Sequence, residues 1–413
     1  MSDPCHIPSV LMSVDDALSL LLSKALPVDE IEHVETASAL GRVLAQPQTS
    51  TLDIPPAATS AMDGYAVAHR DLHAGTETRL RVSQRIPAGG TGWPLERHTA
   101  ARIFTGALLP AGADTVIMQE HCHAEGGTIS IPPGTKAGRN VRRMGEDIAA
   151  GSEILTAGIK LRPQDMGLAA SVGLARLPVY RKLRVAMLCT GDELATPGTP
   201  LAPGKIYNAN RYTLIGLLQS MNCEIIDFGI VPDNLTATRT MLSSAARQAD
   251  VVVSSGGVSV GNEDHVKAAA EELGHIELWR IALKPGKPLA FGAIGETPFF
   301  GLPGNPVSVF VTFFLFARPF ILRRQGITDV LPQTIAVQAD FDWPKAGPRR
   351  EYLRARLTSA DDGAITRATL FHHQGSAALS SVSWAQGLVC IPEGKTVQRG
   401  QMVNFTSFAE LLT

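Results

Sequence analysis

The stretch of sequence that decides the fold is Asp250-Val-Val-Val-Ser-Ser-Gly-Gly-Val-Ser-Val-Gly261. Asp250–Val253 is an almost continuous β-branched run, which is typical of a buried strand. The Ser254–Gly261 run can present several backbone N–H groups to an anion, because its glycines leave no side chain in the way. The following helix, with Asp264 near its start, adds the positive end of a helix dipole. The stretch therefore predicts a strand that leads into a phosphate-binding loop.

Short apolar strands alternate with helices on both sides of this stretch, from residue 182 to residue 325. The other predicted strands are Leu183–Leu188, Cys223–Ile230, Ile276–Leu283, Pro288–Phe291 and Pro298–Gly301. The predicted helices are Asn210–Met221, Ala237–Gln248, His265–Leu273 and a long apolar helix from Pro306 to about Arg324. Alternation at this spacing indicates an α/β domain with a mostly parallel, doubly wound sheet.

Three polar or glycine-rich motifs each follow a strand of this domain. They are Thr190-Gly-Asp-Glu193, Ser254–Gly261 and Leu302-Pro-Gly-Asn-Pro306. In open α/β sheets, ligands bind outside the carboxyl ends of the strands, so we expect the three motifs to converge on one cleft. A tight strand-to-helix turn is the alternative for each motif alone, but it does not explain three motifs at the same edge.

Charged residues recur around the predicted cleft. The acidic ones are Asp192, Glu193, Asp233 and Asp264. Carboxylates gathered at a phosphate site usually hold Mg²⁺, whose charge neutralises the phosphates. A helix cap or a solvated turn is the alternative for any single one, above all for Asp264. The turn Lys284-Pro-Gly-Lys287-Pro288 places two lysines on a rigid backbone, which favours anion capture over a surface salt bridge.

The sequence changes character on both sides of the α/β segment. Ser13-x-x-Asp16 ahead of an apolar helical pattern is a variant of the capping box, and Pro27 follows the predicted helix. Residues 53–146 are rich in Gly and Pro and carry β-like runs such as Thr115–Met118, which predicts a separate β-rich domain. Residues 327–413 lose the helical periodicity and predict a small all-β domain. A chain of 413 residues exceeds the roughly 250–300 residues that one core supports, so several domains are expected.

Composition limits the class of protein. The formal net charge of −2 argues against a general nucleic-acid or membrane-surface binder. The apolar run Val307–Ala317 is too short to span a bilayer and predicts a buried helix. The first residues lack the pattern of a signal peptide, and the five scattered cysteines contain no CxxC pair. Both features are typical of a cytoplasmic protein with reduced thiols.

Two patterns suggest other chemistry. Gly257-Val-Ser259-Val-Gly261 matches the GxSxG nucleophile elbow of serine hydrolases, with Ser259 as nucleophile, and it follows a strand. That elbow needs a helix directly after the serine, whereas Gly261-Asn-Glu263 intervenes here, and no HGGG-type oxyanion segment occurs. His121-Cys-His123 and His372-His373 suggest a metal site. Neighbouring residues on a strand point to opposite faces, however, which favours loop histidines without a shared metal.

Seven runs, in this order, carry a resemblance to a known family: Ser60–Val67, Arg143–Asp147, Thr190–Leu194, Ser254–Gly261, Lys284–Pro288, Leu302–Pro306 and Gln374–Ser376. Together they resemble the molybdopterin molybdenumtransferase family, which includes MoeA and the gephyrin E domain. The resemblance implies a helical linker domain (8–52 and 147–181), a β-rich domain (53–146), a molybdopterin-binding α/β domain (182–325) and a C-terminal β domain (326–413). It also implies an elongated homodimer in which one subunit completes the cleft of the other.

The family's reaction converts adenylylated molybdopterin and molybdate into molybdenum cofactor and AMP, with Mg²⁺ involved. The resemblance implies catalytic and metal-holding roles for Glu193, Asp233 and Asp264, and a catalytic role for Lys284. Asp63, Thr105 and Asp147 are implied to reach in from the other subunit. The other implied substrate contacts are Asp192, Ser255, Gly256, Gly257, Arg280, Lys287, Pro303, Pro306, Arg354 and Ser376.

Two departures from the family's pattern stand out. Arg280 occupies a position that is commonly lysine, and Ala57-Ala-Thr59 replaces a more polar stretch. Two other functions stay open. Adenylylation of molybdopterin is performed by related proteins that resemble the α/β domain alone, so the extra β domains favour insertion. A receptor scaffold like gephyrin would need a long linker and a second catalytic domain, which this sequence does not provide. Other proteins of molybdenum cofactor biosynthesis are the expected physical partners.

Overall fold

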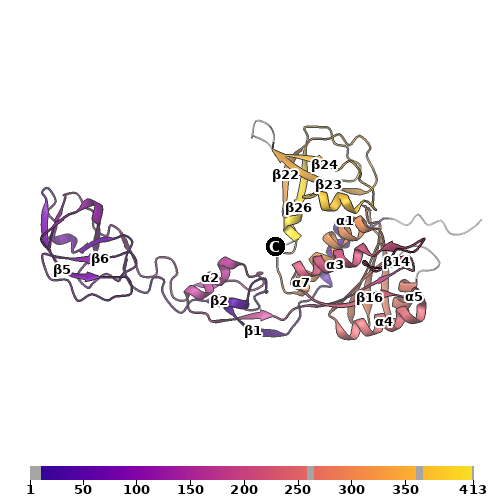
Figure 1. The fold of residues 1–413 in the computed structure, drawn as a ribbon, viewed down its shortest axis with the longest axis horizontal. Coiled ribbons are helices and arrows are strands. Elements are labelled where there is room, and N and C mark those ends of the chain that lie inside the picture. Colours follow the sequence, from indigo (N-terminus) through magenta and orange to yellow (C-terminus); the bar gives the residue numbers. More distant parts are fainter. Residues whose placement is uncertain (1–10, 258–264, 360–365, 412–413) are drawn as a thin grey trace, which may run out of the picture.

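The computed structural model describes residues 11–257, 265–359 and 366–411. The chain is elongated, with a β-rich part at one end and an α/β part at the other (Figure 1). Short strands and helix α2 (Pro163–Ser171) form a linker between them. A C-terminal β-structured part packs on the α/β part, where strand β19 (Leu283–Lys284) pairs with strand β23 (Arg350–Ser359).

The α/β part is built on a six-stranded sheet with the order β16-β13-β17-β21-β20-β18. Its strands are β13 (Arg184–Thr190), β16 (Glu224–Val231), β17 (Val251–Ser255), β18 (Gly274–Arg280), β20 (Pro288–Ile294) and β21 (Thr297–Leu302). The first four strands in this order are parallel, and the last two add in antiparallel fashion. The predicted mostly parallel sheet is therefore confirmed, with an antiparallel edge. A small parallel pair, β14 (Leu194–Ala195) and β15 (Ile206–Tyr207), lies outside this sheet.

Helices cover both faces of this sheet, because neighbouring residues of a strand point to opposite sides. Val251 and Val253 of β17 join one hydrophobic core, whereas Val252 joins the other. The first core also contains side chains of α1 (Val14–Ser23), α3 (Ala209–Ser220), α6 (Pro306–Thr312) and α7 (Arg318–Arg324). The second contains side chains of α4 (Leu235–Gln248) and α5 (His265–Leu273). This is the doubly wound arrangement that the sequence predicted.

The apolar segment Pro306–Arg324 is one continuous helix, in which a π-helical turn, η4 (Phe313–Ala317), joins α6 to α7. Pro319 lacks an N–H group and would crowd the preceding turn of a regular helix, which the wider π-helical turn relieves. The segment is long and apolar enough to cross a membrane, but 83% of its most apolar window is buried inside the protein. It is therefore a core helix, as predicted.

Helix α1 begins where the capping pattern predicts. The Ser13 hydroxyl oxygen accepts a hydrogen bond of 3.0 Å from the Asp16 amide. Its buried side chains, Val14, Ala17 and Leu21, belong to the core of the α/β part. The structure thus separates α1 from the linker domain to which the resemblance assigned it, because the apolar face of α1 is buried against α7 and the sheet.

The linker combines helix α2 with short β-strands. Its two chain segments are joined by antiparallel pairs of β1 (Ile31–Glu35) with β12 (Arg176–Tyr180) and of β2 (Gln48–Thr49) with β11 (Glu153–Leu155). Leu177 and Val179 alternate into a small core, a period of two that suits a strand. Among its described residues, α2 is the only α-helix.

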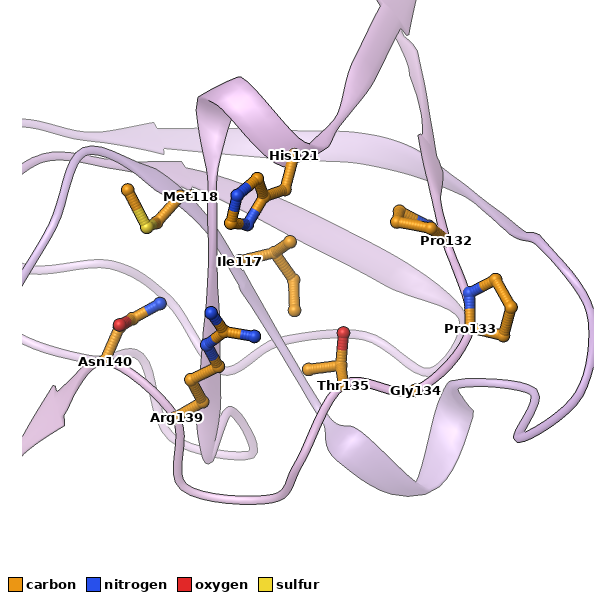
Figure 2. Close-up of a pocket in the computed structure, with 9 residues that line it drawn as sticks. All are labelled: Ile117, Met118, His121, Pro132, Pro133, Gly134, Thr135, Arg139 and Asn140. Atoms are coloured by element: carbon orange, nitrogen blue, oxygen red, sulfur yellow. The ribbon is translucent and has the colours of Figure 1, made fainter.

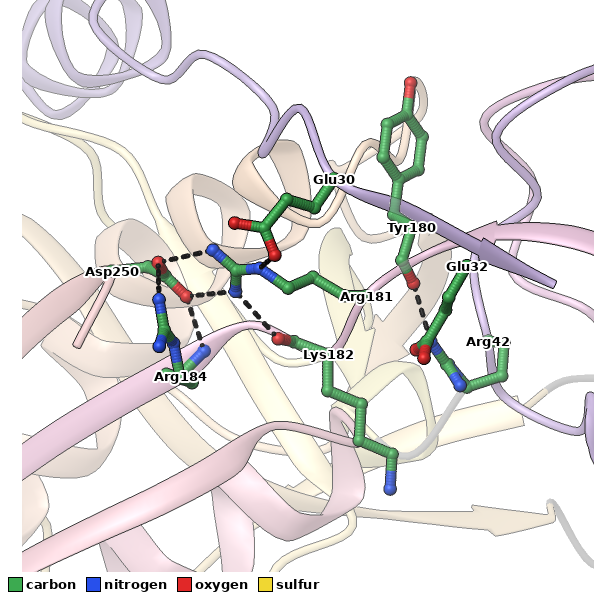
Figure 3. Close-up of polar contacts among 8 residues, drawn as sticks. All are labelled: Glu30, Glu32, Arg42, Tyr180, Arg181, Lys182, Arg184 and Asp250. Atoms are coloured by element: carbon green, nitrogen blue, oxygen red, sulfur yellow. Dashed lines mark hydrogen bonds and ion pairs between the residues drawn. The ribbon is translucent and has the colours of Figure 1, made fainter. Parts of the chain in front are cut away.

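Arginine–carboxylate contacts hold the linker against the α/β part (Figure 3). Arg181 donates hydrogen bonds of 2.6 and 2.8 Å to the carboxylate of Asp250, and one of 2.7 Å to Glu30. The Arg184 amide also donates to Asp250, at 2.8 Å. Burial raises the pKa of Asp250, but the hydrogen bonds from Arg181 and Arg184 outweigh burial and keep that pKa below its ordinary value. Asp250 directly precedes β17, so this junction anchors the strand that leads into the glycine-rich loop.

The β-rich part contains a six-stranded sheet with the order β7-β4-β6-β5-β9-β8. Its strands are β4 (Gly64–Val67), β5 (Thr78–Ile86), β6 (Thr99–Ile103), β7 (Thr115–Met118), β8 (His123–Glu125) and β9 (Thr128–Ile131). Small hydrophobic cores lie on its two faces, as the contrast between Ala66 and Val67 shows. A further pair, β3 (Thr59–Ser60) with β10 (Val141–Arg142), connects this sheet to the linker.

The C-terminal part is a small barrel. Its strands are β22 (Thr334–Ala339), β23, β24 (Thr366–Leu370), β25 (Gly387–Ile391) and β26 (Met402–Ser407). Strand β23 pairs with both β24 and β25, which closes the sheet on itself. The all-β prediction holds except for a short helix, α8 (Leu379–Trp384), which the sequence did not indicate.

Candidate functional site

Three strand ends of the α/β sheet meet where the sequence predicts a cleft. Strands β13, β17 and β21 are parallel neighbours, so Thr190, Ser255 and Leu302 end at one edge. The Gly256 amide donates a hydrogen bond of 3.2 Å to the Leu302 carbonyl. A Cβ at Gly256 would lie 2.6 Å from the Thr190 carbonyl oxygen, and its φ is +90°, so only glycine fits. The three motifs therefore converge as predicted.

This geometry changes the role expected for Gly256 in the loop. Because the Gly256 amide is bonded to Leu302, it is not free to hold a phosphate, and Gly256 serves close packing instead. Gly257 also has a positive φ of +65° and lies against Val266 of α5. The described donors for an anion are therefore the Ser255 hydroxyl and the Gly257 amide.

Asn210 joins two of the three motifs. Its Nδ2 donates hydrogen bonds to Ser255 Oγ at 2.9 Å and to the Gly304 carbonyl at 2.7 Å. Its Oδ1 is buried and has no hydrogen-bond partner among the described residues. Helical periodicity placed Asn210 in a helix and nothing more. The repeated asparagine in Asn208-Ala-Asn210, just at the start of α3, is the signal that could have marked it.

The predicted carboxylates lie at neighbouring strand ends. Glu193 folds back over Gly191, so that a Cβ at Gly191 would lie 2.6 Å from a Glu193 carboxylate oxygen. Asp233 follows β16, the parallel neighbour of β13. Asp192 is exposed, and its carbonyl accepts a hydrogen bond from the Lys205 side chain, a cation that the motifs did not identify. Asp264 and Ser259 lie outside the described residues.

The donor set fits magnesium only together with a substrate. Within residues 11–257, 265–359 and 366–411, no three His, Cys, Asp or Glu side chains are close enough to hold a metal ion. Mg²⁺ is usually bound through one or two carboxylates and completes its shell with phosphate oxygens and water. Glu193 and Asp233, which follow adjacent strands, provide oxygen ligands of this type.

Lys284 forms an ion pair with a buried carboxylate. Its Nζ lies 3.0 Å from Glu351 Oε2, and the Lys284 side chain is 49% exposed whereas that of Glu351 is 8% exposed. Because β19 pairs with β23, this contact connects the α/β part to the barrel. In the same turn, Gly286 has a φ of +110°, and a Cβ there would lie 2.6 Å from Thr312 Cγ2 of α6. Glycine therefore lets the lysine-bearing turn pack on α6.

The other predicted cations lie in or beside this turn, and the barrel loop with Ser376 contacts the start of α6. Lys287 is exposed, and Arg280, which pairs with Pro288, is half-buried. The Ser376 carbonyl accepts a hydrogen bond of 3.0 Å from the Val307 amide, one of the first N–H groups of α6 that lack a partner within the helix. Ser376 is thus held beside the Leu302–Pro306 motif, in which Pro303 is buried and Pro306 begins α6.

Arg354 does not fit the substrate contact that the resemblance implied. Its side chain is fully buried and donates to Ser381 Oγ (3.0 Å), the Tyr352 carbonyl (3.1 Å) and the Gly375 carbonyl (3.2 Å). Burial lowers the pKa of Arg354 to about 10, so the guanidinium is still charged at neutral pH. Arg354 is therefore a positioning residue for the loop that carries Ser376.

In the β-rich part, Asp63 and Thr105 form a tight pair. Asp63 Oδ1 accepts hydrogen bonds from the amide and the hydroxyl of Thr105, both of 2.8 Å. These bonds, the amide first, keep the pKa of Asp63 below its ordinary value. Asp147 is exposed in a different segment, where its amide donates to the Ile54 carbonyl at 3.0 Å. These contacts unite Asp63 with Thr105 but do not include Asp147.

The Asp63–Thr105 pair and the α/β cleft lie at opposite ends of the elongated molecule. Thr105 closely follows β6, which belongs to the end part farthest from α3 and α5 in Figure 1. The linker with α2 separates the two parts. One chain therefore does not bring all the predicted site residues together.

The β-rich part also holds a small cavity of about 90 Å³ that none of the predicted site residues lines. The side chains of His121 and Arg139 project toward each other across it (Figure 2). A guanidinium facing the imidazole opposes a metal cation at His121. His121 ends the short 3₁₀-helix η3 (Gln119–His121) and His123 begins strand β8, so the expected loop position does not hold for these two histidines.

Comparisons with known proteins cover nearly the whole chain. Family profiles match the MoeA N-terminal region (domain I and II) over residues 12–173, a probable molybdopterin binding domain over 186–323, and the MoeA C-terminal region (domain IV) over 336–408. The molybdopterin molybdenumtransferase of Haemophilus influenzae is 37% identical over 408 residues, which is 97% of this chain and 100% of that protein. A Nostoc protein of the same name is also 37% identical, over 95% of this chain and 93% of its own length.

Solved structures agree with this match. A molybdopterin biosynthesis MoeA protein from Pyrococcus horikoshii superimposes with a TM-score of 0.84 at 29% identity, covering 96% of this chain and 100% of that chain. A second structure of a MoeA protein from the same species gives a TM-score of 0.79 at 32% identity, over 97% of this chain and 99% of that chain. The chain belongs to the molybdopterin molybdenumtransferase (MoeA) family.

Proposed function

We propose that this protein inserts molybdenum into molybdopterin, using adenylylated molybdopterin and molybdate and releasing molybdenum cofactor and AMP. One observation carries the proposal: the ends of β13, β17 and β21 converge, and Asn210 joins the loops after β17 and β21, in a chain that matches molybdenumtransferases along its length. The match extends well beyond the α/β part, which favours insertion over adenylylation of molybdopterin.

The loop after β17 holds the nucleotide phosphate. Ser255 Oγ accepts from Asn210, so its own hydrogen is free to donate to a phosphate oxygen. The Gly257 amide and the nearby N-terminus of α5 add further positive charge. Gly256, which has no side chain, allows the loop to approach Thr190 closely.

The carboxylates bind the metal cation, whereas the lysines and Arg280 bind the anionic substrates. Glu193, Asp233 and Asp264 hold Mg²⁺, which neutralises the phosphate charge when bound. Lys284, Lys287 and Arg280 attract molybdate and the phosphate linkage. Glu351 fixes the position of Lys284, and Arg354 fixes the loop of Ser376, so both groups are oriented before substrate binds.

The active site is shared between two subunits of a homodimer. The support is the distance between the β-rich and α/β parts within one chain, seen in Figure 1. A two-fold dimer places the same patch of each subunit against its partner, so the β-rich part of one chain reaches the cleft of the other. Asp63, Thr105 and Asp147 then complete the partner's site. The ionised carboxylate of Asp63 is held ready by Thr105.

We also assign the protein to the cytoplasm. The described cysteines are all free thiols: Cys122, Cys189, Cys223 and Cys390. Burial raises the pKa of Cys122 to about 11, so it stays protonated and unreactive at neutral pH. Unpaired thiols are usual where the environment is reducing.

The proposed function is tested by following AMP release from adenylylated molybdopterin with and without molybdate and Mg²⁺. We expect release to need both ions, and Glu193→Ala to slow it by roughly 100-fold or more. Glu224→Ala is the matched control, because Glu224 is exposed at the opposite end of the same sheet. Full release in excess chelator would show that lysines and arginines suffice without a metal. AMP release independent of molybdate would contradict insertion.

A further inference from the structure

Two arginines lie opposite each other in the β-rich sheet, and among the described residues neither forms an ion pair with a carboxylate. Strands β5 and β6 are parallel neighbours (Figure 1), and Arg85 of β5 lies in register with Arg102 of β6. The other arginines of β5 have carboxylate partners: Arg79 is 3.8 Å from Glu77 and Arg81 is 3.2 Å from Glu96. In the described part of the chain, neither Arg85 nor Arg102 has a carboxylate within such a distance. Like charges at opposed positions destabilise a sheet, so this pair calls for an explanation.

Both guanidinium groups stack on the ring of Phe104. The Cζ atoms of Arg85 and Arg102 each lie 4.7 Å from the centroid of the Phe104 ring. Arg102 also lies 5.2 Å from the Tyr65 ring and donates a hydrogen bond of 3.0 Å to the Gly64 carbonyl. Stacking on aromatic rings orients a guanidinium while leaving its N–H edge available. Both positive charges are thus fixed in place before any ligand arrives.

This group, which we call the arginine row (Arg85, Phe104 and Arg102), adjoins the Asp63–Thr105 pair. Phe104 directly precedes Thr105, and Arg102 donates a hydrogen bond of 2.5 Å to Gln119 Oε1. The backbone amide of Gln119 donates a hydrogen bond of 3.1 Å to the backbone carbonyl of Asp63. Arg102 also contributes to lowering the pKa of Asp63, after the hydrogen bonds from Thr105. The row therefore lies on the part of the sheet that carries the candidate site residues.

We propose that the arginine row binds a phosphate-bearing group, namely the phosphate linkage of the adenylylated substrate held in the partner subunit's α/β cleft. The identity of the substrate rests on the proposed function. Guanidinium groups bind phosphate oxygens through paired N–H donors, and a phosphate between the two arginines removes their mutual repulsion. Arg85 is exposed and Arg102 is half-buried, and because both cations are already oriented on Phe104, binding costs little side-chain entropy.

The test compares Arg85→Met with Arg79→Met in the full-length protein. Methionine keeps apolar contact with Phe104 but removes the charge, and Arg79 is a matched exposed arginine on the same strand. Inorganic pyrophosphate and molybdate are titrated separately by calorimetry. We expect Arg85→Met to weaken pyrophosphate binding about tenfold, and Arg79→Met to change it less than about twofold. The melting temperature of Arg85→Met should equal or exceed that of the unchanged protein, because repulsion is relieved.

Pyrophosphate binding decides the proposal, and the dependence of AMP release on molybdate decides the proposed function. Equal pyrophosphate binding in Arg85→Met and the unchanged protein, or no binding to either, would remove the phosphate site. Weakened molybdate binding with unchanged pyrophosphate binding would show that the arginine row binds molybdate and not a phosphate group. If AMP release fails to depend on molybdate while Arg85→Met still loses pyrophosphate, the proposed function is wrong and the arginine row stands.

Discussion

Asn210 donates a hydrogen bond of 2.9 Å to the hydroxyl oxygen of Ser255, which ties the start of α3 to the loop after β17. The same Nδ2 donates to the Gly304 carbonyl at 2.7 Å, so one amide holds two of the three loops at the cleft. A substrate that contacts both loops depends on their relative position. Small displacements of such groups carry large costs in rate.

We therefore expect Asn210→Ala to lower kcat/KM for AMP release by roughly 10- to 100-fold while the protein stays folded. The loss arises because Ser255 and Gly304 are no longer held in one arrangement. Steady-state kinetics with adenylylated molybdopterin provide the measurement. Gln219→Ala, an exposed change at the other end of α3, is the control and should behave as the unchanged protein does. Equal kinetics in the two variants would refute this role of Asn210.

Replacing Lys284 should lower both the stability and the activity of the protein, for two different reasons. Lys284→Met leaves the buried Glu351 carboxylate without its cation, 3.0 Å away in the unchanged protein. We expect a loss of about 1 kcal/mol in the free energy of unfolding, a small value because solvent screens the half-exposed lysine. AMP release should fall strongly, because Lys284 would no longer attract the anionic substrates.

The double variant Lys284→Met with Glu351→Gln separates these effects. Glutamine removes the uncompensated buried charge, so most of the lost unfolding free energy should return. Activity should stay as low as in Lys284→Met alone. Recovery of activity along with stability would mean that Lys284 serves only to neutralise Glu351.

The junction at Asp250 should make stability depend on acid pH. The folded protein lowers the pKa of Asp250, so folding favours its ionised form. That contribution is complete above the ordinary carboxyl value of about 3.9 and is lost as pH falls through the lower folded pKa. Asp250→Asn should cost roughly 2–3 kcal/mol in urea unfolding at pH 7 and less at pH 3.

Asp340→Asn is the matched control for this experiment. Asp340 pairs with Arg399 at 2.8 Å, but the arginine side chain is 65% exposed, so the pair is screened by solvent. We expect this change to cost less than about 1 kcal/mol. An Asp250→Asn cost that is the same at pH 3 and pH 7 would exclude ionisation of Asp250 as the cause.

The sequence predicted the architecture of the cleft because strand and turn signals are local. Val251–Val253 and the glycines that follow them mark a buried strand and a close approach without any knowledge of the rest of the fold. Contacts between distant segments were not predictable in this way. Asn210 meets Ser255 only after the sheet has formed, and helical periodicity alone does not indicate that contact.

Burial of polar residues was the second limit. Arg354 stands in a strand of the barrel, and the family resemblance alone implied a substrate contact there. Its guanidinium instead bonds carbonyl groups of Tyr352 and Gly375, which become neighbours only when the barrel closes. Helix α1 shows the same limit, since its apolar face predicts burial but not against which domain.

The most direct test of the shared active site is to mix two inactive variants, Asp63→Ala and Glu193→Ala. These lesions lie in the β-rich and α/β parts, which are at opposite ends of one chain (Figure 1). If sites are shared, a mixed dimer carries both lesions in one site and none in the other. After subunit exchange, half of the dimers are mixed, so AMP release should recover to at most about a quarter of that of the unchanged protein. No recovery, with subunit exchange demonstrated and both variants folded, would mean that each chain builds its own site.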